Sequence, residues 1–118
     1  KWGAACMRAT GAQIPTVCQK SLDDTLALQP EIQRVNQLMM SFMVEANARS
    51  NLANYYIKQE MAQKHCDQSE KVLITGLYAS KYKDHDFFPP IKQIANSHVA
   101  DVKLCRKLFG APAQGVKL

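Results

Sequence analysis

Apolar residues recur at helical spacing through most of the chain. The strongest stripe has apolar positions three or four residues apart: Ile32, Val35, Met39, Phe42 and Ala46. This spacing places one face of an α-helix against a core, and the pattern continues to about residue 65. We therefore predict a long helix over about residues 31–65, with Pro30 in its first turn. Residues 47–51 have low helix propensity, so the sequence leaves open whether the helix is continuous or broken there.

Two shorter helices are predicted on either side of this stripe. Residues 17–28 follow Thr16, a residue type that caps helix starts. Residues 68–82 follow Asp67, which with Glu70 has the spacing of a capping box. The inward face of this second helix would hold four residues: Val72, Leu73, Leu77 and Tyr78. Its Gly76 indicates close packing against a neighbouring helix.

A last helix is predicted over residues 90–109. It follows an expected loop over residues 84–90, and Gly110 can adopt the left-handed conformation that ends helices. Its apolar face comprises eight residues: Ile91, Ile94, Ala95, Val99, Val102, Cys105, Leu108 and Phe109. His98 falls on the same inward side, where a histidine can be a satisfied core residue or a ligand-binding one.

No segment alternates apolar and polar residues long enough to form a sheet. The predicted fold is therefore all-α: a small helical bundle of about four helices with a long central helix. We expect a single domain over residues 1–118. Gly3, Gly11 and Pro15 predict an irregular segment over residues 1–16, which leaves room for a short helix over residues 4–10, and residues 111–118 are expected to be a mobile tail.

The four cysteines predict two disulfides. No two of them have metal-ligand spacing. At 1.5 Å per residue, helices 68–82 and 90–109 bring Cys66 and Cys105 to the same level, which favours a Cys66–Cys105 bridge and leaves Cys6–Cys18 by elimination. The other two pairings stay open, as do four free thiols. Disulfides indicate a secreted or periplasmic protein, and a chain beginning at Lys1 is consistent with a removed signal peptide.

Composition narrows the functional classes. The 118 residues are 47% hydrophobic and 21% charged, which excludes an intrinsically disordered chain, and no apolar run approaches the roughly 20 residues of a membrane span. The net charge of +5 has its excess at the two ends of the chain. This density of positive charge is low for a nucleic-acid binder, which argues against nucleic acid as a partner and favours a protein with an acidic surface.

No catalytic, metal or cofactor motif emerges, so we expect a non-catalytic protein without a cofactor. Residues 85–87, His-Asp-Phe, are similar to a tripeptide of secreted phospholipases A2, but the cysteine, helix and glycine-rich calcium loop of that family are missing around them. Glu45 and Arg49 have the spacing of a surface ion pair on a helix.

The leading functional hypothesis is a secreted or periplasmic helical protein that acts through protein–protein interaction. The expected contact residues are cations and tyrosines, which are favoured in interfaces: Tyr55, Tyr56, Lys103, Arg106 and Lys107. A second copy of the chain is one candidate partner. The sequence cannot separate this hypothesis from a cytokine-like or toxin-like secreted effector.

An alternative hypothesis is a carrier of a small hydrophobic ligand in the bundle core. Methionine-rich interiors adapt to ligands of varied shape. The cavity of such a carrier would be lined by five residues: Met39, Phe42, Met43, Tyr56 and His98.

Overall fold

The computed structural model describes residues 4–118 and confirms the all-α class. Within these residues there are six α-helices and no strand. The helices are α1 (Ala4–Arg8), α2 (Gln13–Leu28), α3 (Val35–Lys58), α4 (Ala62–Ala79), α5 (Phe88–Ser97) and α6 (Val99–Phe109), with short 3-10 helices η1 (Gln29–Glu31) and η2 (Ser80–Tyr82). Among residues 4–118, none of the helices combines the length with the hydropathy that a membrane span requires. Residues 1–3, part of the expected irregular segment, lie outside the described residues.

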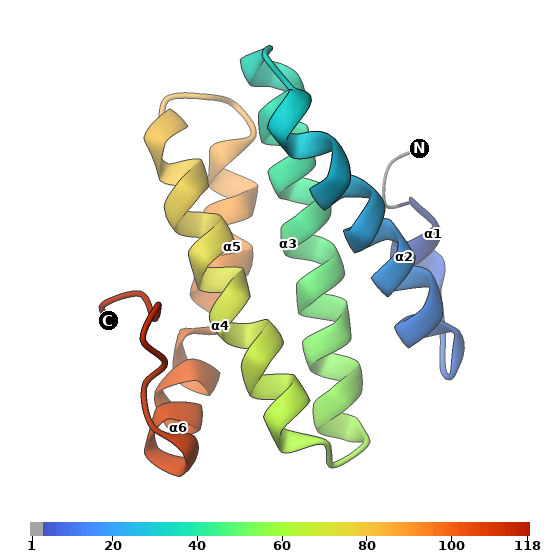
Figure 1. Cartoon of the computed structure of the whole chain (residues 1–118), viewed down its shortest axis with the longest axis vertical. Helices are drawn as coiled ribbons and strands as arrows, with labels where there is room; N and C mark the ends of the chain where they lie inside the picture. Colours follow the sequence, from blue (N-terminus) through green and yellow to red (C-terminus); the bar gives the residue numbers. More distant parts are fainter. Residues whose placement is uncertain (1–3) are drawn as a thin grey trace.

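The long helix α3 is the centre of the bundle. Figure 1 shows it between α2 and α4, with α5 packed behind and α6 at the end where α4 begins. Three groups of buried apolar residues hold these helices together, each drawn from at least two helices: Cys6, Cys18, Leu22, Ala48 and Leu52; Met39, Phe42, Ala46, Ala79 and Ile91; and Val72, Leu73, Ala95 and Val102. The core therefore follows both sides of α3.

The N-terminal segment contains the short helix that the sequence left open, but its second half is more regular than predicted. Helix α1 occupies Ala4–Arg8, and α2 begins at Gln13 instead of residue 17. Gly11 makes the turn between them with a φ of +54°. Pro15 is tolerated because it lies in the first turn of α2, where backbone N–H groups lack helical partners. The expected interruption at Pro15 is thus wrong.

The long helix has different ends from those predicted. Pro30 lies in η1, and Ile32 and Arg34 are extended, so α3 starts only at Val35. The helix runs without a break through residues 47–51 and ends at Lys58. The chain then reverses at Glu60, which has a φ of +60°. Packing on both sides of α3 outweighs the weak local propensity of residues 47–51.

The predicted capping box is also wrong, because α4 already begins at Ala62. Asp67 and Glu70 consequently lie inside the helix, where Asp67 pairs with Lys71 and Glu70 with Arg106. Val72 and Leu73 are buried as expected, whereas Leu77 and Tyr78 are exposed.

The last predicted helix is in fact two helices. Helix α5 begins at Phe88, with prolines in its first turn, and the helical path breaks at His98, where ψ is 0°. Beyond the break, Val102 and Cys105 stay buried, but Leu108 and Phe109 are exposed. The expected burial of those two residues is wrong because the break ends the continuous stripe shared with α5.

Both predicted disulfides are present. Cys6 joins Cys18 across α1 and α2, and Cys66 joins Cys105 across α4 and α6. The C-terminal segment after Gly110 also contacts the bundle: Val116 packs against the cluster of Val72 and Val102, and its carbonyl accepts a hydrogen bond from Arg106.

Candidate functional site

Helix α6 is fastened to α4 by covalent and ionic contacts. The disulfide between Cys66 and Cys105 joins the two helices. One turn further along α4, Glu70 accepts two parallel hydrogen bonds from Arg106, at 2.9 Å from Nε and 3.0 Å from Nη2. This hydrogen bonding to the carboxylate raises the pKa of Arg106 above its ordinary value. Arg106 also donates to the carbonyl of Val116 at 2.6 Å, which ties the C-terminal segment to α6.

The outer face of α6 combines apolar and basic side chains. Leu104 and Leu108 lie one turn apart and are 58% and 63% exposed. Lys103 and Lys107, also one turn apart, are exposed beside them, and neither forms an ion pair within residues 4–118. We call these four residues the α6 outer face. This face is amphipathic, because two aliphatic side chains lie next to two cations.

A groove runs between α4 and the C-terminal end of α6. It has a volume of about 520 Å³ and is lined by the sulfur-bearing residues Cys66 and Cys105, with Phe109 and Pro112 on the α6 side and Ile74 on the α4 side. The groove adjoins the α6 outer face through Phe109, which is exposed.

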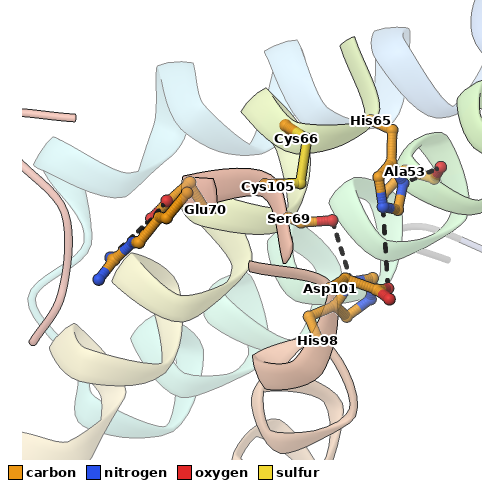
Figure 2. The surroundings of a disulfide bond; sticks show 9 residues. Ala53, His65, Cys66, Ser69, Glu70, His98, Asp101 and Cys105 are labelled. Carbon is orange, nitrogen blue, oxygen red and sulfur yellow. Dashed lines mark hydrogen bonds and ion pairs between the residues drawn. A yellow bond between two sulfur atoms is a disulfide. The ribbon is translucent and has the colours of Figure 1, made fainter. Parts of the chain in front are cut away.

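Beneath α6, on the other side of the disulfide, lies a cluster of polar side chains. Figure 2 shows His65 from α4 and Asp101 from α6 pointing toward each other, with His98 next to Asp101. His65 is buried, and its Nδ1 lies 2.8 Å from the carbonyl oxygen of Ala53 on α3. Its Nε2 lies 3.8 Å from Oδ2 of Asp101.

His98 forms the second half of this cluster and is only 2% exposed. Its Nε2 lies 2.8 Å from Oγ of Ser50 on α3, and its Nδ1 lies 3.3 Å from Oγ of Ser69 on α4. Asp101 Oδ2 is 3.9 Å from the same Nδ1. Burial lowers the pKa of His98; the Asp101 carboxylate opposes this effect, and His65 adds to it. The imidazole thus joins three helices at the α5–α6 break.

Ser50, His98 and Asp101 are the residue types of a hydrolytic triad, with the histidine between the serine and the aspartate, but their geometry differs from that of a triad. A carboxylate at 3.9 Å is beyond hydrogen-bond distance of the imidazole, and Ser69 occupies that nitrogen instead. The buried imidazole is enclosed by protein. Within residues 4–118, no three histidine, cysteine or acidic residues are arranged to hold a metal ion. The geometry is therefore that of a buried hydrogen-bond network.

The predicted contact residues lie in two places. Tyr55 and Tyr56 are half-buried at the end of α3, with ring centroids 5.8 Å apart, and Lys64 lies over the Tyr56 ring. Lys103 and Lys107 belong to the α6 outer face, whereas Arg106 is turned toward Glu70. The structure therefore keeps the two predicted cations together, turns the third inward and places the tyrosines on a different helix.

The residues predicted to line a ligand cavity are divided among three places. Met39, Phe42 and Met43 pack together with Ile91. Tyr56 packs against the cluster that contains the Cys6–Cys18 disulfide, and His98 belongs to the polar cluster under α6. The five residues consequently do not share one lining.

Two features escaped sequence reasoning. Glu45 and Arg49, expected at the surface, are buried in the interior. The approach of His65 to Asp101 was also missed, although the sequence contained a signal: His65 precedes Cys66, and Asp101 lies one turn before Cys105. The predicted Cys66–Cys105 bridge therefore already implied that these two side chains are neighbours.

The chain was also compared with known proteins. No protein-family model, no curated protein and no solved structure matches it.

Proposed function

We propose that this protein is a secreted or periplasmic, non-catalytic protein that binds another protein through the α6 outer face. The observation that carries the proposal is the exposure of Leu104 and Leu108, one turn apart, beside the exposed cations Lys103 and Lys107. Burying apolar surface is worth roughly 25 cal/mol per Å², so two adjacent aliphatic side chains offer a partner a compact source of binding free energy.

The charges beside the leucines indicate an acidic partner. Lys103 and Lys107 have no carboxylate partner among residues 4–118, and the chain as a whole carries a net charge of +5. An acidic rim around an apolar depression would complement both properties of this face. Because the lysines are exposed, their contribution would weaken as salt is added.

The attachment of α6 supports a binding role. A disulfide and a two-point ion pair fix the inner side of α6 to α4. A surface that is already rigid loses less conformational entropy on binding than a flexible one. The contacts that leave Leu104 and Leu108 exposed therefore also prepare them for association.

The two disulfides support a location outside the reducing cytoplasm, because such bonds form and persist in oxidising compartments. They are compatible with both a secreted and a periplasmic protein.

The proposal can be tested with a synthetic helical peptide that carries leucines one turn apart, flanked by glutamates. Binding is followed by chemical-shift changes in a ¹H–¹⁵N spectrum of the whole protein. We expect the largest changes at residues 99–109, and weaker binding as salt is raised. A peptide with lysines in place of the glutamates should not bind.

A charge-reversal variant sharpens this test. Lys103→Glu/Lys107→Glu should weaken peptide binding at least about tenfold, since two attractive contacts become repulsive. Lys81→Glu/Lys83→Glu, which makes the same charge change at the far end of α4, should bind as the wild type does. The proposal would be overturned by chemical-shift changes located outside residues 99–109. It would also be overturned if the protein bound anionic phospholipid vesicles but not the acidic peptide.

A natural partner can then be sought with a photo-crosslinking residue at position 104 and, as a control, at the exposed position 92 of α5. We expect one acidic protein to crosslink from position 104 alone. Equal crosslinking from both positions would contradict a specific interface.

A further inference from the structure

We infer that His65 and Asp101 form an acid-operated latch, in which one proton taken up by His65 Nε2 creates an ion pair that holds α6 more firmly to α4. The latch concerns the underside of the helix whose outer face is proposed above to bind a partner. Its existence does not depend on that function, and only its consequence for binding rests on the proposed function.

The hydrogen bond to Ala53 determines which nitrogen of His65 carries the proton in the neutral state. A carbonyl oxygen only accepts, so Nδ1 of His65 must donate across the 2.8 Å contact. Neutral His65 therefore has a lone pair, and no proton, at Nε2. That lone pair faces Oδ2 of Asp101 at 3.8 Å, and an ionised carboxylate also only accepts. In the neutral state the two side chains consequently cannot form a hydrogen bond.

Protonation of His65 reverses this relationship. The imidazolium keeps its bond from Nδ1 to Ala53 and gains an N–H at Nε2 directed at Asp101 (Figure 2). A small approach of the half-exposed Asp101 side chain then completes a charge-assisted hydrogen bond between α4 and α6. One proton thus converts a contact between two acceptors into a bridge between two helices.

His98 is not the group that takes up this proton. Both of its nitrogens already have hydroxyl partners, Ser50 and Ser69, which can donate or accept as the neutral tautomer requires. Its burial lowers its pKa, and a charge on His65 disfavours its protonation further. The proton is therefore disfavoured on His98, which instead holds the α5–α6 break in place through its two hydroxyl partners.

The other buried charges on the surrounding helices are already neutralised. They are Glu45 with Arg49 on α3, and Glu70 of α4 with Arg106 of α6. Cys66, which follows His65 on α4, is in a disulfide and therefore does not titrate. Asp101 is thus the one carboxylate within ion-pair distance of either histidine among residues 4–118.

The position of Asp101 in the first turn of α6 gives the latch its effect. The far half of α6 is fixed by Cys105 and Arg106, whereas the first turn follows the break at His98. The latch therefore controls the part of α6 between the break and the disulfide. Leu104 of the outer face lies within this part.

The test uses the complete protein with both disulfides intact. Ring signals of the histidines are followed by NMR between about pH 8 and about pH 5, where imidazoles titrate. Amide protection factors of residues 99–104 are measured at about pH 7.5 and about pH 5.5. We expect His65 to take up its proton before His98, and protection to rise roughly two- to fivefold at the lower pH, as is typical of a partly exposed ion pair.

Asp101→Asn should remove the pH dependence of the bridge. The amide of asparagine can donate to the lone pair of neutral His65 at about pH 7.5, and its oxygen can accept from the imidazolium at about pH 5.5. The bridge should therefore form at both of these pH values, about 7.5 and about 5.5, and most of the change in protection should disappear. Asp86→Asn, in the loop at the other end of α4, should behave as the wild type does. Proton uptake by His98 before His65, or an unchanged pH response in Asp101→Asn, would overturn the latch.

Peptide binding measured at both pH values separates this inference from the proposed function. If the latch signals appear and the acidic peptide does not bind at either pH, the proposed function fails while the latch stands. If the peptide binds equally in wild type and Asp101→Asn at both pH values and the protection factors do not change, the latch fails while the binding function stands.

Discussion

Glu45 and Arg49 lie one turn apart on α3 and form an ion pair inside the protein, with Oε2 of the carboxylate 3.0 Å from Nε of the guanidinium. The two residues are 7% and 8% exposed. Gln29 and Thr75 donate further hydrogen bonds to Glu45, at 2.8 Å and 2.9 Å, and Arg49 donates to Gln68 at 3.0 Å. The network satisfies both charges and links η1, α3 and α4.

Removing one partner of this pair should cost more than removing both charges. Arg49→Met leaves a buried carboxylate without its cation and should lower the free energy of unfolding by about 3–5 kcal/mol. Glu45→Gln/Arg49→Met should cost less, because the uncharged amide can accept from Gln29 through its oxygen and donate to Thr75 through its NH2, while the Thr75 hydroxyl donates to the carbonyl of Lys71. Urea unfolding checks both values. The exposed pair provides the control: Lys20→Met should cost at most about 1 kcal/mol. A double variant less stable than Arg49→Met would contradict this account.

Gly76 allows α4 and α5 to approach closely. A Cβ at this position would lie 2.8 Å from Cβ of Ala95, below any normal contact distance. Gly76→Ala should therefore lose about 1–2 kcal/mol of stability even though alanine is the better helix former by about 1 kcal/mol. Gly76→Ala/Ala95→Gly restores the space and should return close to wild-type stability in thermal unfolding. If the losses of stability from the two single substitutions simply added in the double variant, the close contact between positions 76 and 95 would not be the cause of the Gly76→Ala loss.

The two disulfides should contribute unequally. Cys66–Cys105 closes a sequence separation of 39 residues and Cys6–Cys18 one of 12. Since the entropy lost by the unfolded chain grows with loop length, Cys66→Ala/Cys105→Ala should cost about 1 kcal/mol more than Cys6→Ala/Cys18→Ala. Urea unfolding of the two variants gives the comparison. The reverse order would mean that native-state packing around Cys6 and Cys18, and not loop closure, dominates.

Burial of His98 should make the fold sensitive to acid. In the folded state, burial lowers the pKa of His98 from its ordinary value of 6.5. Below pH 6.5 the unfolded chain therefore binds a proton at this position more readily than the folded chain does. Stability is therefore lost as the pH falls from 6.5 toward the lower folded-state pKa. The measurement is a difference, in which the contributions of the other titrating groups cancel: the stability advantage of wild type over His98→Asn should shrink as the pH is lowered. An advantage that grows with acid would reverse the assignment.

The helical class and both disulfide pairings were predictable from the chain alone, with Cys6–Cys18 following by elimination. The apolar spacing of Val35, Met39 and Phe42 predicts a helix because side-chain direction repeats with the local backbone period. The Cys66–Cys105 pairing follows from the constant rise per residue of two antiparallel helices. The spacing of Lys103 and Lys107, four residues apart in a predicted helix, likewise places the two cations on one face.

Tertiary structure decided where the helices break and which polar groups are buried. Leu108 was predicted in the core, and the break at His98 leaves it exposed. That break is held by Ser50 and Ser69, which lie 48 and 29 residues away in sequence. The burial of Glu45 likewise depends on Thr75 from another helix. Local periodicity reports which face of a helix is apolar, whereas satisfying a buried charge or imidazole requires partners that only the packed helices bring together.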